Sequence, residues 1–370
     1  MEWIVRSEGR RQGNADGGCR LLGLDADLPV RRAWSRLEAH ARLPTQGYAF
    51  ARALSRTLLA RSRCAVLVAP GVGGGSALLP LCRDRGYFAR WRGMGPQEVF
   101  EPADVLCAGG EGTRLLAEAL AGQSRALRID RMPADSPLLP ALRRSFRGKG
   151  WVSVRPATPT PTISLDPRWQ DPEGCFNARR RSDFRRAARK AEEFGRVDIE
   201  VCSPGPDIFD ALFEEAVAVE ARSWKTQAGT AIALDRAKEA FFRDFFGAAS
   251  RDGTLRIAFL RIDGRAVAMQ MALECLGRYW LFKIGYDEAY GKCSPGTLLM
   301  LHTLGWAARR GLQSYELLGH VEPWIAELWT RESRECVRLR TYPFGIRGAA
   351  SLAADGVAWA LARAGRTDAD

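Results

Sequence analysis

The tetrapeptide Ser294-Pro295-Gly296-Thr297 is the part of the sequence best suited to hold an anion. Serine is a favoured N-cap residue, and proline suits the first helical position because no partner is needed there for an N–H. Apolar residues then recur at steps of three and four, which predicts a helix that ends at Gly311. Gly296 leaves the mouth of this helix without a side chain, so a pyrophosphate could approach the first backbone N–H groups at the positive end of the dipole. The alternative is that these residues merely cap a buried helix.

Three closely spaced strands are expected before this helix, and a fourth strand is expected after it. Asp263-Gly264 and Leu276-Gly277 separate the first three strands with turn residues, which predicts an antiparallel meander. The expected strands are 255–262, 266–275, 278–286 and 314–318, and three amphipathic helices are expected upstream at 177–194, 208–223 and 236–249. The resulting unit has the order β-β-β-α-β.

The first half of the chain shows a coarser version of the same order. Two helices are expected within 33–59, then strands at 64–69 and 77–82 joined by the glycine cluster 71–75. The remaining expectations are a strand at 87–91, a helix at 111–121, a strand at 126–129, a helix at 137–148 and a strand at 151–154. The proline-rich stretch 156–161 is interpreted as a domain crossover or linker rather than a helix or central strand.

These patterns predict an α/β (α+β) protein of two domains, each with a mixed, mainly antiparallel sheet flanked by helices. A length of 370 residues fits two domains of ordinary size. The expected divisions are a polar N-terminal segment 1–23, a first domain 24–160, a second domain 161–346, and a C-terminal helix and tail 347–370.

Composition narrows the class of protein. The formal charge is +12, but six of the 55 basic residues are lysine and the rest arginine, a skew that a GC-rich coding sequence would also produce. We therefore infer only that the net positive charge attracts an acidic ligand toward the protein. Nine scattered cysteines without a C-x-x-C pair indicate reduced thiols, and three histidines far apart in sequence suggest no metal site. No apolar run is long enough for a transmembrane helix, and residues 1–11 lack the apolar core of a signal peptide, so a cytoplasmic location is expected.

Several of these segments together resemble a known family. The sequence from Gly285-Tyr286-Asp287-Glu288 to Ser294-Pro295-Gly296-Thr297-Leu298-Leu299, the upstream Glu220-x-x-x-Trp224-Lys225 and the hairpin Asp263-Gly264-x-x-Val267-Ala268 are similar to the CelD/BcsL-type acetyltransferases of the GNAT superfamily. The resemblance extends from about Ala33 to Phe344 and includes Leu79-Pro80-Leu81.

The resemblance implies two tandem GNAT-like domains, an arrangement shared with the FemABX peptidyltransferases, and an acyl-CoA, such as acetyl-CoA, bound at the second domain. The pyrophosphate would lie on the turn formed by Lys292, Cys293, Ser294, Pro295, Gly296, Thr297 and Leu298. The pantetheine arm would lie beside Lys283, Ile284, Gly285 and Tyr286. The turn Lys292-Cys293-Ser294-Pro295-Gly296 stands where the family has a glycine-rich phosphate turn.

Acyl transfer to an amine requires a held thioester, donors for the developing oxyanion and a route for the amine proton. Glu220 and Glu316 are the carboxylates that we expect to serve as base; the alternatives are a solvated helix face and a strand-end salt bridge. Trp224 is a candidate for the wall of the acceptor site, or else a core residue. Lys225 is a candidate partner for a phosphate or an acidic acceptor, or else solvated. The acceptor would be an amine of a sugar, amino acid or other small metabolite, in a pathway such as polysaccharide biosynthesis.

Two other functions stay open. Seven basic residues within 177–194 could bind an aminoacyl-tRNA, as a FemABX-like enzyme would require, although acidic residues interrupt them and no aromatic stacking motif accompanies them. A nucleic acid is therefore the alternative and not the expected partner. The chain could also be a non-catalytic assembly protein with a decayed acyl-CoA site. Residues 349–364 are expected to pack on the body, with a membrane surface as the alternative.

Overall fold

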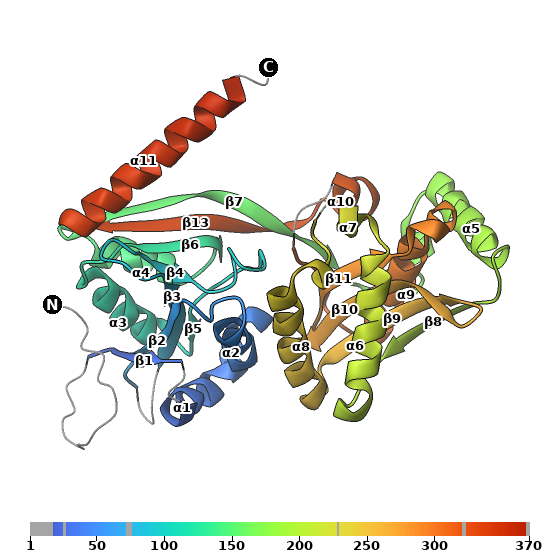
Figure 1. The fold of residues 1–370 in the computed structure, drawn as a ribbon, viewed down its shortest axis with the longest axis horizontal. Helices are drawn as coiled ribbons and strands as arrows, with labels where there is room; N and C mark the ends of the chain where they lie inside the picture. The colour runs from blue at the N-terminus through green and yellow to red at the C-terminus, as the bar shows by residue number, and fades with distance from the viewer. Residues whose placement is uncertain (1–17, 25–26, 72–75, 228, 320–322, 368–370) are drawn as a thin grey trace. The chain divides into compact units, whose positions relative to one another are not determined.

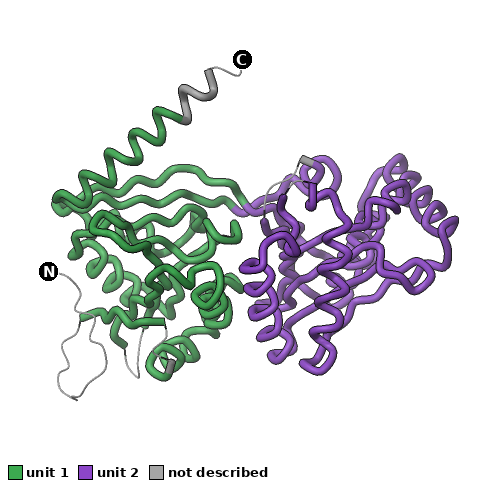
Figure 2. The backbone as a smooth tube through the Cα atoms, viewed as in Figure 1, with its two compact units in different colours: residues 1–159, 335–370 green, residues 160–334 purple. Residues whose placement is uncertain are grey.

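The chain divides into two compact units. The computed structural model describes residues 18–24, 27–71, 76–227, 229–319 and 323–367. Unit 1 comprises Met1–Pro159 and Glu335–Asp370, and unit 2 comprises Thr160–Arg334 (Figure 2). Unit 2 thus ends before residue 346, the end expected for the second domain, because most of β13 (Ser333–Pro343) pairs with a strand of unit 1.

Unit 2 is a mixed sheet with helices on both faces (Figure 1). Its strand order is β7-β12-β11-β10-β9-β8, and every pair recorded for it is antiparallel except β11 with β12. The elements are α5 (Ala178–Glu192), β8 (Val197–Cys202), α6 (Pro206–Ala221), α7 (Trp224–Gln227), α8 (Arg236–Arg251), β9 (Leu255–Ile262), β10 (Arg265–Cys275), β11 (Arg278–Tyr286), α9 (Pro295–Arg309), β12 (Ser314–Leu317) and α10 (Pro323–Leu328). The end of β7 (Gly150–Ser164) completes it.

The predicted meander is confirmed, and turn chemistry explains it. Asp263 and Gly264 have φ angles of 48° and 78°, and Leu276 and Gly277 have 56° and 67°. Two consecutive positive φ angles are the signature of the type I′ turn, whose twist matches that of the strands that it joins. The three expected upstream helices are also confirmed as α5, α6 and α8.

Two different apolar layers cover the faces of this sheet. On one face, Tyr279 and Leu281 of β11 pack with Met300 and Leu304 of α9. On the other face, the ring of Phe282 packs against aromatic rings of α8 at 5.5 and 5.9 Å. The register of β10 against β11 shifts here, since Met271 pairs with Lys283 while Ala272 pairs with Leu281. This β-bulge reverses the alternation of side chains along the rest of β11.

Unit 1 repeats the same plan. Its elements are β1 (Arg20–Gly23), α1 (Asp27–Leu37), α2 (Tyr48–Arg56), β2 (Arg63–Ala69), β3 (Ala77–Arg83), β4 (Trp91–Gly93), β5 (Leu106–Cys107), α3 (Gly110–Ala121), β6 (Leu127–Pro133), α4 (Leu138–Ser145), most of β7 and β13, and α11 (Ile346–Thr367). The strand order is β1-β2-β3-β4-β6-β13-β7, with β5 beside β3. Antiparallel strands lead through α3 to β6, which pairs parallel with β4. In unit 2 the chain leads in the same way through α9 to the parallel pair β11–β12.

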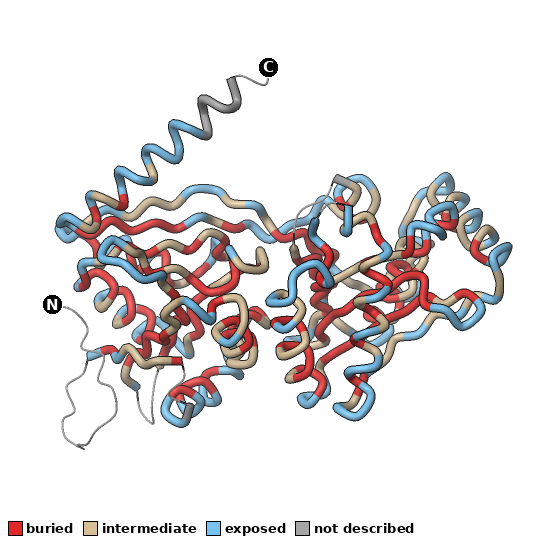
Figure 3. Tube along the Cα trace, in the orientation of Figure 1, coloured by how far each residue is buried: buried red, intermediate tan, exposed pale blue. Residues whose placement is uncertain are grey.

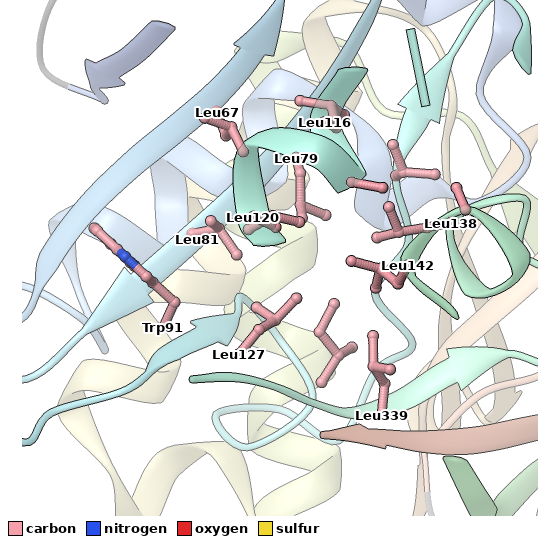
Figure 4. Packing of buried hydrophobic residues seen from close by; sticks show 14 of the residues in the cluster. Leu67, Leu79, Leu81, Trp91, Leu116, Leu120, Leu127, Leu138, Leu142 and Leu339 are labelled. Atoms are coloured by element: carbon pink, nitrogen blue, oxygen red, sulfur yellow. The ribbon is translucent and has the colours of Figure 1, made fainter. Parts of the chain in front are cut away.

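Leucine side chains dominate the core of unit 1 (Figure 4). Leu116 and Leu120 of α3 and Leu142 of α4 are fully buried against the sheet together with Leu79 of β3. The hairpin expected from 64–69 and 77–82 is confirmed as β2 and β3, whereas residues 72–75 of its glycine cluster lie outside the described part.

The strand expected at 87–91 is wrong. The strand β4 begins at Trp91, and Tyr87 and Phe88 are exposed. The guanidinium of Arg125 donates hydrogen bonds to the carbonyls of Tyr87 and Ala89 at 2.8 Å each. These carbonyls therefore accept hydrogen bonds from a side chain and not from a neighbouring strand.

The stretch 156–161 is the domain crossover that the sequence predicted, since the first segment of unit 1 ends at Pro159. It is not a linker, because β7 continues through it as one strand. The N–H of Thr162 donates to the carbonyl of Glu332 at 3.1 Å. Alternate N–H groups of a strand point to opposite edges, so Pro159 and Pro161 place their missing donors on the other edge. The ladder with β12 begins at Thr162, after both prolines.

The ends of the chain differ in part from expectation. Arg20–Gly23, expected within a polar segment, pair as β1 with β2, and residues 1–17 of that segment lie outside the described part. The C-terminal helix forms as α11. Among the described residues, none of the helices has the length and apolar character needed to cross a membrane.

Candidate functional site

In the sheet of unit 2, β11 extends beyond the end of its neighbour β12, and this leaves one edge of β11 unpaired at an opening in the sheet. β11 and β12 pair from Arg278 with Ser314 to Leu281 with Leu317, and the N–H of Leu318 donates to Leu281 at 3.2 Å. β11 then continues to Tyr286 beyond the ladder with β12. Its last residues therefore present a strand edge to which an extended ligand can hydrogen-bond.

The register identifies the backbone groups at that edge. The N–H of Asp287 donates to Val267 at 2.8 Å, so residues 285 and 287 exchange hydrogen bonds with β10. In an antiparallel pair the intervening residues turn their N–H and C=O groups away. Ile284 and Tyr286 thus direct their backbone groups toward the opening.

A cavity of about 290 Å³ lies at this opening. Three elements supply most of its wall: the end of β11, the start of α9, and α10 with the residue that follows it. The lining residues are Trp224, Met269, Gln270, Ile284, Gly285, Tyr286, Gly296, Thr297, Met300, Trp324, Leu328 and Trp329. Such a wall is mainly aromatic and aliphatic with few polar groups, as in small-molecule sites generally.

The start of α9 forms one side of the cavity. Ser294 is its N-cap as expected, but Ser294 has left-handed angles (φ 47°, ψ 55°) and its side chain makes no capping hydrogen bond. The N–H groups of Thr297 and Leu298 instead donate to the Ser294 carbonyl at 3.0 and 3.3 Å. A Cβ at Gly296 would lie 3.3 Å from the ring of Tyr286, so this glycine lets the helix mouth approach β11 closely.

Glu220 and Lys225 form a buried ion pair beside the open edge. Nζ of Lys225 lies 3.1 Å from Oε1 of Glu220 and donates to the carbonyl of Ile284 at 2.6 Å. The other oxygen of Glu220 accepts the N–H of Ile232 at 2.8 Å. Glu220 is fully buried under Gly285, where a Cβ would come within 3.0 Å of the Glu220 backbone. The lysine, and not the carboxylate, therefore reaches the edge.

Glu316 lies elsewhere. It is fully buried on β12, where it accepts hydrogen bonds from Ser314 Oγ at 2.6 Å and from the guanidinium of Arg334 at 2.6 and 3.0 Å. It does not line the cavity. This geometry supports the alternative of a strand-end salt bridge.

Trp224 lies at the cavity wall, and its indole ring packs on Tyr286 with 5.1 Å between ring centroids. It is half-buried, which distinguishes it from the fully buried core tryptophans Trp34 and Trp280. An aromatic side chain in this position can cover a bound ligand.

Of the residues expected to hold the cofactor, Ile284, Gly285, Tyr286, Gly296 and Thr297 line the cavity. The others do not. Lys283 places its ammonium over the ring of Phe242, 4.5 Å from the centroid, on the α8 face of the sheet. Lys292 and Ser294 are exposed before the helix, Pro295 is buried, and Leu298 packs into the core. Cys293 is buried with its thiol directed at the Tyr290 carbonyl at 3.1 Å, and burial raises the pKa of this thiol.

A polar chain under the cavity was missed by the sequence analysis. The Tyr315 hydroxyl donates to Oε1 of Gln270 at 3.0 Å and lies 3.1 Å from the Thr303 hydroxyl, and burial raises the pKa of Tyr315. Gln270 is a lone polar residue in the apolar sequence 266–273, which was a usable signal. Trp324 and Trp329 carried no comparable signal, because they reach the cavity through the placement of α10.

Comparisons with known proteins identify the type of domain in unit 2. Residues 178–324 match the family model for the acetyltransferase (GNAT) domain, so unit 2 carries a domain of this type. A search of curated proteins finds no significant match.

Three solved structures are similar to the chain. The C-terminal domain (DUF2156) of an Agrobacterium fabrum protein assigned as a lysylphosphatidylglycerol synthetase is 12% identical with a TM-score of 0.54, covering 89% of this chain and 95% of that one. FemX is 12% identical with a TM-score of 0.53, covering 79% and 88%. A tandem GNAT protein from the clavulanic acid biosynthesis pathway is 17% identical with a TM-score of 0.46, covering 89% and 99%. The first two likenesses cover both units, and the expected fold of two GNAT-like units is confirmed.

Proposed function

We propose that the chain is an acyl-CoA-dependent N-acyltransferase whose donor site is the cavity of unit 2. The observation that carries this proposal is the apolar cavity at an open strand edge, with a lysine ammonium at that edge and a glycine at the helix mouth. The acceptor is an amine of a sugar, amino acid or small metabolite. The CelD/BcsL resemblance favours a role in polysaccharide biosynthesis.

The residues fit an acyl-CoA by shape and by chemistry. A cavity of about 290 Å³ suits the acyl-pantetheine arm, and the Ile284 N–H and the backbone groups of Tyr286 match the amides of that arm, whereas the Ile284 carbonyl is held by Lys225. Gly296 leaves the first turn of α9 open for the pyrophosphate, and exposed Lys292 adds positive charge close to that turn. When bound, the donor supplies a thioester activated for attack by an amine.

We assign to Lys225 the stabilisation of the donor's thioester carbonyl during the reaction. Its ammonium lies at the open edge, where it can stabilise negative charge that develops on the carbonyl oxygen. Glu220 holds this ammonium in place and, being fully buried, acts through Lys225 rather than on the amine itself. Trp224 and the tryptophans near α10 exclude water from the acyl group.

Calorimetric titration with CoA and acetyl-CoA tests the donor. The wild-type chain should bind both, and Gly296→Glu should bind neither, because its carboxylate occupies the pyrophosphate position. Gly296→Ala is the matched control: its added Cβ carries no charge and meets only the Tyr286 ring within 4 Å, at 3.3 Å, so binding should weaken far less than in Gly296→Glu. Absence of wild-type binding would reject the donor, and unchanged binding by folded Gly296→Glu would place the donor elsewhere.

An aminoacyl-tRNA is the second candidate donor. Arg180 of α5 donates to the Glu327 carbonyl of α10 at 3.3 Å, so the arginine-rich helix lies against a wall of the cavity. Arg179 and Arg189 on that helix are exposed. The likeness to FemX, an aminoacyltransferase, fits this donor as well. The donor would be tRNA if activity were sensitive to ribonuclease and were lost in Arg179→Glu/Arg189→Glu while CoA did not bind.

A further inference from the structure

A buried glutamine in the cavity of unit 2 carries a hydrogen-bond donor that the proposed acyl transfer does not use. Strand β10 is buried over most of its length (Figure 3), and its Gln270 lines the cavity while being only 2% exposed. The Tyr315 hydroxyl donates to Oε1 of Gln270 at 3.0 Å. Among the described residues the amide NH2 group has no hydrogen-bond partner, and its nitrogen is not enclosed by protein atoms. The amide nitrogen is therefore directed at the cavity.

Tyr315 determines which end of the amide the cavity receives. A glutamine amide can turn over and exchange its oxygen, which accepts, with its nitrogen, which donates. Tyr315 is fully buried, and its hydroxyl lies 3.1 Å from the hydroxyl of Thr303, which can donate to it. The Tyr315 proton is then directed at Gln270, and this holds the amide oxygen on the Tyr315 side. The cavity consequently offers a donor, so its ligand has to supply an acceptor.

Gln270 and the Lys225–Glu220 ion pair approach β11 from opposite faces of the sheet. Gln270 pairs with Ile284, and residues directly opposite each other on neighbouring strands share a face. Ile284 packs with the cluster that includes α9. A Cβ at Gly285, the next residue, would point at Glu220, because successive residues of a strand face opposite sides. Lys225 and Gln270 can therefore contact different atoms of one acyl donor.

The surroundings of Gln270 favour a neutral acceptor. None of the described residues that line the cavity is charged, and Met269, Met300 and Leu328 are among them. An ionised carboxylate would lose its hydration here against a neutral amide, which is costly. An ammonium group has no acceptor to offer, and a plain alkyl chain would cover the Gln270 donor without pairing it. A hydroxyl or keto oxygen satisfies the donor without introducing a charge.

We propose that Gln270 selects a short acyl group that carries a hydroxyl or keto oxygen beyond its thioester. This inference rests on the proposed function, since it requires an acyl-CoA in this cavity. The thioester carbonyl lies at Lys225, the carbon chain lies among the apolar side chains of the wall, and the further oxygen accepts from Nε2 of Gln270. Tyr315 is a positioning residue that keeps Nε2 in the cavity. A site that hydrogen-bonds one group of its substrate rejects the analogue that lacks this group, because the donor of the site is then left unpaired.

Calorimetry with matched thioesters tests the proposal without an acceptor amine. 3-Hydroxybutyryl-CoA and butyryl-CoA differ by one hydroxyl, and the wild-type chain should bind the former about 10- to 100-fold more tightly. Acetoacetyl-CoA, whose keto oxygen accepts but does not donate, should share this advantage. A preference for 3-hydroxybutyryl-CoA alone would mean that the hydroxyl donates, and would overturn the assignment. Equal affinities for all three would overturn the selection but leave the acyl-CoA site in place, whereas failure to bind any of them or CoA would reject the proposed function itself.

Variants locate the preference at the amide. Gln270→Met removes the donor at nearly constant length, so both butyryl thioesters should bind with similar affinity. Gln313→Met, the same change at an exposed glutamine of unit 2, should keep the wild-type preference. Tyr315→Phe lets the amide turn over and should lower the ratio of the two affinities while affinity for CoA stays unchanged, a result that a merely structural role would not produce.

Two results with Gln270→Met would overturn the proposal. An equal loss of affinity for both butyryl thioesters would place Nε2 at the thioester carbonyl that they share. An unchanged ratio of affinities would place recognition of the hydroxyl on another residue. The ratio measured on the wild-type chain decides the selection even if a buried variant does not fold.

Discussion

The two units share one plan but differ at the equivalent place. In unit 2, β11 continues from Leu281 to Tyr286 beyond its parallel ladder. In unit 1, β4 ends at Gly93, one residue beyond its ladder with β6. A Cβ at Gly93 would lie 3.1 Å from the Ile129 side chain, so core packing fills this region. The length of one strand thus separates an open site from a closed core.

The two units also differ in the partners of the buried carboxyl groups Glu220, Glu316 and Asp104. Glu220 and Glu316 in unit 2 each lie beside a cation, Lys225 and Arg334. Asp104 in unit 1 is buried with hydrogen bonds from Ser136 Oγ at 2.5 Å and the Val105 N–H at 2.8 Å. Burial raises the pKa of Asp104 to about 6. The stability of unit 1 should therefore depend on pH through Asp104.

The largest expected effect tests whether the two cores are separate. Leu142→Ala in unit 1 and Leu304→Ala in unit 2 each remove a fully buried side chain and should each cost about 2–5 kcal/mol of unfolding free energy. Differential scanning calorimetry should show a lowered transition for the altered unit alone. A single transition lowered by both variants would show that the units unfold together.

Lys225→Met should lower kcat/KM by about 100-fold while leaving CoA affinity nearly unchanged, because the ammonium acts on charge that develops during transfer. Glu220→Gln should lower kcat/KM by a smaller factor, since the amide oxygen of the glutamine still accepts a hydrogen bond from Lys225. Steady-state kinetics with an amine acceptor, and calorimetry for CoA, measure the two quantities. A Lys225→Met enzyme with unchanged kcat/KM would remove Lys225 from the reaction.

The pH response of unit 1 should depend on Asp104. Because its folded-state pKa of about 6 lies above the ordinary value, the folded state retains a proton that the unfolded state loses. Stability should therefore fall by about 1–3 kcal/mol as the pH rises from 4 to 7, and be regained on acidification. Urea unfolding of Asp104→Asn should lack this decrease. An identical decrease in the variant would assign the response to another group.

Glu316→Gln should have the smallest effect on function. Its cation Arg334 is partly exposed, so loss of the ion pair should cost about 1–2 kcal/mol of stability. Acyl transfer at saturating substrate should stay close to wild type, as measured by steady-state kinetics. A large fall in kcat with unchanged stability would restore Glu316 as a base.

Local patterns predicted the fold of unit 2 well, because its turns and helix start are written in consecutive residues. Asp263-Gly264 and Leu276-Gly277 require positive φ angles, and these define the meander. The same approach found the domain crossover at 156–161 but excluded a central strand there because of the proline count. The strand forms there because Pro159 and Pro161 face an edge where no ladder has begun, and that depends on which strands become neighbours.

The sequence predicted those residues of the candidate site that belong to local motifs, but not the contacts between residues distant in sequence. Gly296 was found because it lies in a recognisable helix start, and Gly285 because the family resemblance places the pantetheine arm beside its strand. The contact between Lys225 and the Ile284 carbonyl, and the hydrogen bond between Tyr315 and Gln270, join residues far apart in sequence. They depend on the β-bulge in β11 and on sheet register, which no short motif specifies.

The position of β13 has a consequence for synthesis of the chain on the ribosome. Unit 1 places β13 between β6 and β7, although some 170 residues separate β7 from β13 along the chain. While unit 2 is being translated, β6 and β7 are already made, and the edges that β13 later covers stay unpaired. Unpaired edges invite pairing with other chains. The nascent chain is therefore most prone to aggregate late in translation, and insertion of β13 ends that exposure.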